Sequence, residues 1–318
     1  MIRFIITRLL LLVLGLFVAS ALIFFTLRVL PGDVAQVIGG TQATPAQIEA
    51  IRKSLGLDRN VFLQYADWIG GLLRFDLGDS LVTGTPVATE LAEKLSVTLP
   101  LALLSLIFGL LIGIPLGIVS AIRHAKASGA VIAISAQALA AVPAVWAGVL
   151  LISLFGLALR WLPTQGFPLD GWDEPGRAIR SLILPALTIG VIEGAVLLRF
   201  TRSAALDAIG QDYVRTAAAI GLTKTRALVT HGLPNVMLSV ISSLGLQIAG
   251  LIVGAVIVEQ LFQLPGVGRM LVGDVGNRDL PKVQGDIFTL TAIVLLVGFA
   301  VDIAHRLIDP RQRTEVSS

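Results

Sequence analysis

The stretch that decides the fold is Gln211–Asn235, which reads QDYVRTAAAIGLTKTRALVTHGLPN. It lies between two apolar segments, at about 181–201 and 236–258, that are each long enough to cross a bilayer. The quoted stretch is too polar to continue either of them, so it is expected outside the hydrocarbon. Its ordered pattern of small and apolar residues sets it apart from an ordinary linker.

This stretch predicts a short helix, a glycine and a second short helix. Tyr213, Ala217 and Ile220 recur at helical spacing. Gly221 follows them where a helix commonly ends on a left-handed residue, and Thr223 can cap a further turn. A helix pair this short cannot bury a core of its own, so we expect it to need a partner surface. A solvated connector is the alternative.

The composition of the whole chain predicts an all-α polytopic membrane protein. Of 318 residues, 55% are hydrophobic and 14% charged, and the mean hydropathy is +0.87. Six apolar segments are expected to be transmembrane helices, at about 9–30, 99–122, 130–159, 181–201, 236–258 and 285–304. Cysteine is absent, which excludes disulfides, thiolate chemistry and cysteine-bound metals.

The distribution of lysine and arginine predicts that both termini are cytoplasmic. With the N-terminus inside, the inner segments hold twelve basic and five acidic residues, and the outer segments hold eleven basic and fifteen acidic residues. The short basic loop at 123–126 is the clearest inward anchor. No basic patch interleaved with aromatic residues is present, so nucleic acid is not expected as a partner.

Residues 31–98 are predicted to form a helical extracytoplasmic cap between the first two spans. Thr44, Pro45 and Gln47 form a helix-start pattern, and Gly56 is the expected stop. A second, aromatic-bearing helix is expected at 61–73. The cap is a candidate surface for docking a substrate-binding protein, and the alternative is a lid that packs only on its own bundle.

Polar residues inside the apolar segments are candidates for a translocation pathway. Glu193 is the most unusual, since a carboxylate near mid-membrane costs about 2.5–3.5 kcal/mol and should face protein or water. It is expected either to line the pathway or to make a structural pair. Further pathway candidates are Gln137, Ser242 and Gln247, for which hydrogen bonding between helices is the alternative.

The glycines of the second span, Gly109, Gly113 and Gly117, recur every four residues. Small residues at this spacing let two membrane helices approach closely, so we expect a tight helix pair here. No phosphate-binding glycine loop with a following Lys-Ser or Lys-Thr is present, so ATP is not expected to bind this chain.

The spacing within the 211–235 stretch resembles the cytoplasmic loop of ATP-binding-cassette (ABC) importer permeases. That family carries Glu-Ala-Ala, three residues, Gly, nine residues, Ile, one residue and Leu-Pro. The pattern falls here on Arg215, Thr216, Ala217, Gly221, His231, Leu233 and Pro234. Arg215 replaces the Glu and His231 the Ile, and the DYVRTA and GL strings resemble the peptide and nickel branch, which normally lacks the Glu.

The resemblance implies that a separate ATPase docks on the helix at 211–222. The implied coupling residues are Asp212, Tyr213, Arg215, Thr216, Ala217, Gly221, Leu222, Leu233 and Pro234. It also implies a homologous second permease, two ATPase copies or two ATPase types, and an extracytoplasmic substrate-binding protein. ATP and Mg²⁺ would be used by the ATPases, and no cofactor, metal or catalytic residue is expected in this chain.

Two strings after the fifth span also resemble the peptide branch, EQLFQLPGVGR from Glu259 and NRDLPKVQG from Asn277. They are expected to form an outer loop, with the Pro-Gly pair reversing the chain into a short re-entrant hairpin. The implied binding-protein side consists of Glu259, Phe262, Pro265, Gly266, Gly268, Arg269, Asn277 and Asp279. Together with RVLPGD near residue 33 and DPR near residue 310, the resemblance covers nearly the whole chain.

The expected organisation has four parts: a first transmembrane helix at 1–30, the cap at 31–98, a five-helix core at 99–309 and a cytoplasmic tail at 310–318. The coupling loop occupies 205–235 within the core. The predicted function is a permease subunit of an ABC importer in a bacterial or archaeal cytoplasmic membrane, forming half of a pathway for peptides or similar solutes. A nickel or metal-chelate importer is the alternative, and a secondary transporter is a weaker one because no internal repeat is visible.

Overall fold

The computed structural model describes residues 2–29, 34–40, 42–54 and 56–308, and these residues form helices joined by turns. The first half contains α1 (Ile2–Val29), α2 (Val34–Gly39), α3 (Pro45–Ser54), α4 (Val61–Leu72), α5 (Val87–Ile122), α6 (Ala127–Ala140), α7 (Ala144–Leu151) and the π-helix η1 (Ile152–Ala158). The second half contains α8 (Pro175–Ile209), α9 (Asp212–Ala219), α10 (Lys224–Ala227), the π-helix η2 (Leu228–Gly232), α11 (Leu233–Phe262), α12 (Val267–Asn277) and α13 (Leu280–Ile308). Most of the RVLPGD string, at 30–33, and the predicted tail at 310–318 lie outside the described residues.

The described residues contain five helices that are long and apolar enough to cross a membrane, or up to seven spans if each of two bent helix pairs counts as one. This confirms an all-helical polytopic membrane protein. The predicted count of six transmembrane helices stays a prediction, and one of the six predicted segments, 130–159, is bent.

The predicted third span, 130–159, is wrong as a single helix. The chain breaks between α6 and α7, and the two halves of this segment meet at 105°. Pro143 explains the break, because it has no backbone N–H and its ring disfavours helical backbone at the preceding residue. A hydropathy profile does not detect such a break, because the residues on both sides of it are apolar.

The outer loop predicted after the fifth span is largely helical. The turn at Pro265-Gly266 follows the end of α11, and α12 begins directly after it. Thr98 supports the start of α12, since its hydroxyl accepts a hydrogen bond from the backbone N–H of Val267 at 2.9 Å. Arg278, with a φ of 53°, ends α12, and α13 begins two residues later within the NRDLP string.

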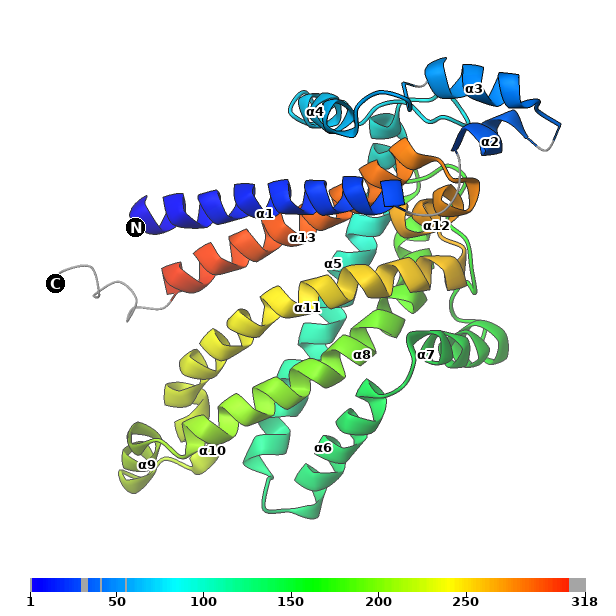
Figure 1. Cartoon of the computed structure of the whole chain (residues 1–318). Coiled ribbons are helices and arrows are strands. Elements are labelled where there is room, and N and C mark those ends of the chain that lie inside the picture. Colours follow the sequence, from blue (N-terminus) through cyan, green and yellow to red (C-terminus); the bar gives the residue numbers. More distant parts are fainter. Residues whose placement is uncertain (1, 30–33, 41, 55, 309–318) are drawn as a thin grey trace. The chain divides into compact units, whose positions relative to one another are not determined.

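The described chain divides into two compact units. One comprises Met1–Ile5, Leu99–Leu264 and Val297–Ser318, and the other comprises Ile6–Thr98 and Pro265–Leu296. In the first unit, α8 lies beside both α11 and α6, and α9 and α10 lie at the ends of α8 and α11 (Figure 1).

The close pairing predicted from the glycine repeat is confirmed between α5 and α8. A Cβ atom added at Gly113 would lie 2.8 Å from the backbone oxygen of Gly194, and one at Gly117 would lie 2.6 Å from Cβ of Thr201. Gly194 in turn lies against the backbone oxygen of Gly109. The two backbones are therefore in direct contact, which places α8 firmly in the first unit.

The second unit is built around aromatic side chains from α1, α4 and α13. Phe24 is buried against Tyr65 and Trp68, with ring centroids 5.3 and 5.8 Å away, and Trp68 meets Phe288 edge to face. Ser20 and Tyr65 share a hydrogen bond of 2.9 Å. These contacts tie the helix predicted at 61–73 to two apolar helices.

The predicted start of α3 is confirmed in detail. Gln47 accepts a hydrogen bond from the backbone N–H of Thr44 at 2.8 Å, and Thr44 accepts one from the backbone N–H of Gln47 at 3.4 Å. This reciprocal pair is the capping arrangement that the sequence indicated. Gly56 follows with a positive φ of 63°.

Candidate functional site

The 211–235 stretch folds as a small helical hairpin at the junction of α8 and α11. Val214 and Ala217 of α9 are buried against Ala227 of α10, and Leu222 packs on them from the turn between the helices. Thr223 accepts a hydrogen bond from the backbone N–H of Arg226 at 3.3 Å, as its predicted capping role requires. The hairpin is therefore held together by its own small apolar cluster.

The turn of this hairpin has the backbone expected of its glycine. Gly221 adopts a φ of 106°, and a Cβ added there would meet nothing within 4 Å. Glycine is therefore favoured at this position by the backbone conformation and not by a lack of space for a side chain. The neighbouring Ile220 is 79% exposed, which leaves a large aliphatic side chain bare at the tip of a segment outside the apolar spans.

The structure changes the interpretation of Ala217. The resemblance implied that Ala217 is one of the coupling residues, but its side chain is only 5% exposed and faces α10. The buried face of α9 consists of Val214 and Ala217 rather than of Tyr213, Ala217 and Ile220. A bulky residue at 217 would disrupt the hairpin itself and would report nothing about a partner.

The remaining coupling candidates surround this core. Asp212, Arg215 and Thr216 are exposed on α9, Leu222 and Leu233 are partly buried, and Pro234 is exposed near the start of α11. Asp212 and Arg215 lie 3.9 Å apart as an exposed pair, and such pairs contribute little to stability. Their charges instead shape the exposed face of the hairpin.

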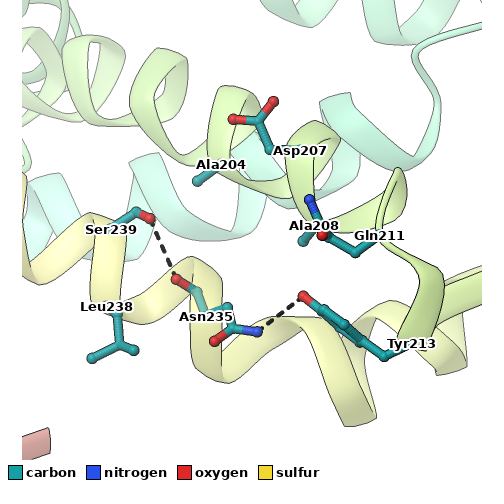
Figure 2. A pocket seen from close by; sticks show the side chains of 8 residues that line it. All are labelled: Ala204, Asp207, Ala208, Gln211, Tyr213, Asn235, Leu238 and Ser239. Atoms are coloured by element: carbon teal, nitrogen blue, oxygen red, sulfur yellow. Dashed lines mark hydrogen bonds between the residues drawn. The ribbon is translucent and has the colours of Figure 1, made fainter. Parts of the chain in front are cut away.

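A hydrogen bond connects α9 to α11 across a cavity of about 330 Å³ (Figure 2). The side-chain amide of Asn235 donates to the hydroxyl of Tyr213 at 2.9 Å. Asp207 and Gln211, at the end of α8, line the same cavity. Tyr213 thus links the hairpin to the first turn of α11, a role that the sequence pattern alone did not show.

Glu193 lies between two helices rather than in a cluster of charges. A Cβ added at Gly250 of α11 would lie 2.9 Å from a carboxylate oxygen of Glu193, and Cβ of Glu193 lies near Gly109 of α5. Among the described residues, no ion pair involves Glu193. The role of Glu193 at the pathway stays a prediction. The alternative, a structural ion pair, is not formed with any described residue of this chain.

The other pathway candidates do not meet Glu193 at one site. Gln137 lines a separate cavity between α6 and α8. Gln247 is buried, and Ser242 donates a hydrogen bond to the Leu238 carbonyl of its own helix at 3.0 Å. Ser242 therefore makes no interhelical hydrogen bond among the described residues.

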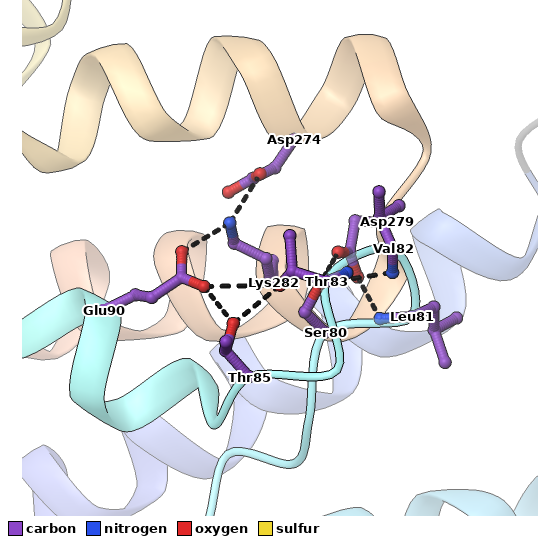
Figure 3. A network of polar contacts seen from close by, with 9 residues as sticks. All are labelled: Ser80, Leu81, Val82, Thr83, Thr85, Glu90, Asp274, Asp279 and Lys282. Carbon is purple, nitrogen blue, oxygen red and sulfur yellow. Dashed lines mark hydrogen bonds and ion pairs between the residues drawn. The ribbon is translucent and has the colours of Figure 1, made fainter.

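A buried polar network occupies the second unit (Figure 3). The ammonium group of Lys282 on α13 lies 2.7 Å from Glu90 on α5 and 3.0 Å from Asp274 on α12. Asp279 accepts hydrogen bonds from the Ser80 hydroxyl at 2.5 Å and from the backbone N–H of Leu81 at 3.1 Å. The segment DLGDS at 76–80 and the NRDLP string from Asn277, far apart in the sequence, are thus joined directly.

Most residues predicted for the binding-protein side are buried within this chain. They are Glu259, Phe262, Gly266, Gly268 and Asp279. Their part in docking a binding protein stays a prediction. Of the predicted set, Arg269 and Asn277 are exposed and Pro265 is partly buried.

Sequence reasoning missed Lys282, Asp274, Glu90 and Asn235. One usable signal was the spacing of Asp279, Lys282 and Asp286, which fall three and four residues apart at the start of an apolar helix. Charges on one face at that position indicate a partner within the protein. Asn235 carried no such signal, because its partner lies 22 residues earlier in a different helix.

The comparisons with known proteins agree with this architecture. Residues 113–314 match the family described as Binding-protein-dependent transport system inner membrane component, and residues 1–102 match Binding-prot-dependent transport system membrane comp, N-term. The chain belongs to this family. The permease is also 37% identical over 316 residues to the glutathione transport system permease protein GsiC of Escherichia coli O6:H1, which covers 98% of this chain and 99% of that protein.

A second relative and one solved structure are also similar to the permease. GsiC of Shigella flexneri serotype 5b is 36% identical over 316 residues, covering 98% of the permease and 99% of that protein. An inward-facing structure of the MetNI methionine ABC transporter has a TM-score of 0.56 at 16% identity, covering 69% of the permease and 96% of that chain. The MetNI likeness concerns the fold alone. The permease is a transmembrane subunit of an ABC importer of the dipeptide and oligopeptide family, and such subunits are not the catalytic ones.

Proposed function

We propose that the permease forms half of a translocation pathway for peptides, the other half being a homologous permease. GsiC, to which the chain aligns over nearly its full length, is named for glutathione transport. A small peptide with free carboxylates is therefore the solute class that this likeness supports. Substrate would reach the permease from an extracytoplasmic binding protein, and cytoplasmic ATPases would supply ATP hydrolysis with Mg²⁺.

The proposed topology places six spans in the membrane, with both bent pairs buried in the assembly. Both termini and the α9–α10 hairpin would be cytoplasmic. The helices α2, α3 and α4 would form the extracytoplasmic cap in the 31–98 region, and the exposed Arg269 and Asn277 would lie on the same outer side. Glu193, Gln137, Ser242 and Gln247 remain the pathway candidates.

The proposed ATPase contact is the tip of the α9–α10 hairpin, and exposed Ile220 is the observation that carries it. Ile220 has 79% of its surface exposed at the tip of a segment outside the apolar spans, where an apolar pocket on the ATPase would bury it. The hairpin has its own core, so it can move as one body, and the Tyr213–Asn235 hydrogen bond passes that movement to α11. Coupling then requires the ATPase to contact Ile220 differently in its two states.

The test is Ile220→Asp in the complete importer. A buried aspartate in an apolar contact is strongly unfavourable, so we expect at least a tenfold loss of ATPase co-purifying with the permease. Transport should fall in parallel, while the amount of permease in the membrane stays unchanged. Quantitative mass spectrometry of the purified complex measures both subunits in one sample.

The matched control is Thr230→Asp, which introduces the same charge at an exposed position of η2, ten residues along the chain from Ile220. It should retain ATPase association within about twofold of the parent. Full ATPase association in Ile220→Asp would show that the hairpin tip is not the contact. Equal losses in both variants would point to a general charge effect and would also remove Ile220 from this role.

A further inference from the structure

A cavity of about 210 Å³ lies between α6 and α8, away from the α9–α10 hairpin. Most of its lining is small and apolar, contributed by Ala133, Ala136, Ala140, Ala195, Val196 and Leu198. Three polar side chains complete it: Gln137 from α6, and Arg199 and Arg202 from α8. No acidic side chain is among the described residues that line this cavity.

The two guanidinium groups have no anion within the described chain. Arg199 lies over the ring of Phe200 at 5.6 Å, a contact that leaves its hydrogen-bond donors available. The Nε atom of Arg202 is buried, and no described residue accepts a hydrogen bond from it. No ion pair joins either arginine to another described residue.

The buried Nε–H group of Arg202 is the unfavourable feature of this cavity, because a buried donor without a partner loses its hydrogen bond to water. The side chains of Arg199 and Gln137 are exposed, so their donors are free to meet the same acceptor. Glu193, the carboxylate in the middle of the same helix, lies against Gly250 of α11 and does not line the cavity. An acceptor for Arg202 Nε therefore comes from outside the described chain.

The hydrogen-bond donors around the cavity indicate which chemical group the acceptor is. Arg199 and Arg202 are three residues apart on α8, so both can reach one group from the same face. The planar fork of arginine matches the paired oxygens of a carboxylate or phosphate, and the amide of Gln137 adds a neutral donor from the facing helix. A cation or an apolar ligand would leave all of these donors without acceptors.

We propose that the α6–α8 cavity is an oxyanion site, in which Arg199, Arg202 and Gln137 hold one carboxylate or phosphate group. Two molecules available to a membrane importer carry such a group. One is the transported peptide through its carboxylate, and this source rests on the function proposed above. The other is a phospholipid through its headgroup phosphate, which requires only that the chain lies in a membrane.

The absence of cysteine from the permease provides the assay. Ala133→Cys places a thiol in the cavity wall without removing any proposed donor, and its labelling by N-ethylmaleimide in the purified complex is followed by the mass of this chain. Trialanine is compared with trialanine amide, and dioleoylphosphatidylglycerol with dioleoylglycerol. Each pair differs in the oxyanion but keeps the rest of the molecule similar.

We expect one oxyanion probe to slow labelling at least fivefold while its matched partner without the oxyanion has little effect. Slowing by trialanine identifies a solute carboxylate, and slowing by the phospholipid identifies a headgroup phosphate. Either result supports the site. Equal rates with all four probes, at Ala133→Cys and again at Ala140→Cys, would overturn it.

The double variant Arg199→Gln/Arg202→Gln should abolish the protection. Arg177→Gln/Arg180→Gln is the matched control, because it removes the same two charges from exposed positions at the other end of α8 and should keep full protection. Arg202→Lys, which keeps the charge but loses the fork, should give a weaker protection and covers the case in which the double variant does not fold. Protection that persists without both arginines would contradict the assignment.

The outcome is independent of the coupling proposal. Labelling is a binding measurement on the complex and needs no ATP hydrolysis, so a failed oxyanion test leaves Ile220 and the ATPase contact untouched. Conversely, a failed Ile220→Asp test would not change the protection measured at Ala133→Cys.

Discussion

At the scale of single residues, Lys282 places an ammonium group between Asp274, which is buried, and Glu90, which is mostly buried. Removing one partner from such a site leaves charge without compensation in a poorly solvated place. We therefore expect Lys282→Met to lower the free energy of unfolding by about 3–5 kcal/mol. The measurement is the temperature at which the purified complex loses half of its folded permease in detergent.

The control variant for Lys282 also removes the negative charges of its two partners. Lys282→Met combined with Glu90→Gln and Asp274→Asn should recover part of the lost thermal stability, because the two carboxylates that pair with Lys282 are neutralised. The buried Asp286 is the same in both variants. If the triple variant is as unstable as the single one, the defect is lost packing of the lysine stem, and the electrostatic account is wrong.

At the scale of elements, α5 and α8 are held by backbone contact through glycine. A methyl group at Gly117 would collide with Cβ of Thr201 and with the backbone oxygen of Leu198 at 2.9 Å. Because the backbone cannot move aside cheaply, Gly117→Ala should cost about 1–3 kcal/mol and reduce the yield of folded permease. Gly298→Ala in α13 is the matched control, since nothing lies within 4 Å of its added Cβ, and its yield should be unchanged.

At the scale of the whole molecule, the proposed topology puts the 160–180 segment outside and the α9–α10 hairpin inside. The absence of cysteine again makes the test simple. In intact cells, a membrane-impermeant maleimide should label Leu169→Cys, which is fully exposed, and should not label Thr225→Cys until the cells are permeabilised. Labelling of both before permeabilisation would contradict the inward position of the hairpin.

Local features of the fold could be predicted because their causes lie within a few residues. The Thr44–Gln47 cap and the positive φ at Gly221 each depend on a short pattern that the sequence displays. The glycine repeat of α5 was equally clear, since it needs only the spacing of its own members. In each case the physical constraint acts on the backbone near the residues that show it.

Other features could not be predicted because their partners are distant in sequence or hidden by uniform hydropathy. Ser80 and Asp279 are 199 residues apart, and the sequence around neither residue indicates the other as its partner. Pro143 was visible, but the apolar residues around it read as one span. For Val214 and Tyr213, helical periodicity left two adjacent faces of α9 nearly equivalent, and the contact with α10 chose between them.

The length of α8 has a mechanical consequence. Its 35 residues extend about 52 Å at 1.5 Å per residue, well beyond a hydrocarbon core of about 30 Å. Pro185 interrupts the helix ten residues from its start, where the missing backbone hydrogen bond makes bending easiest. The remaining 24 residues span about 36 Å, and α5 is packed against them at Gly190, Gly194 and Thr201. A tilt of about 10° at Pro185 would therefore move both helices together and displace the attached hairpin by about 6 Å. A small change of helix angle would thus move the hairpin by a distance comparable to the rise of one helical turn.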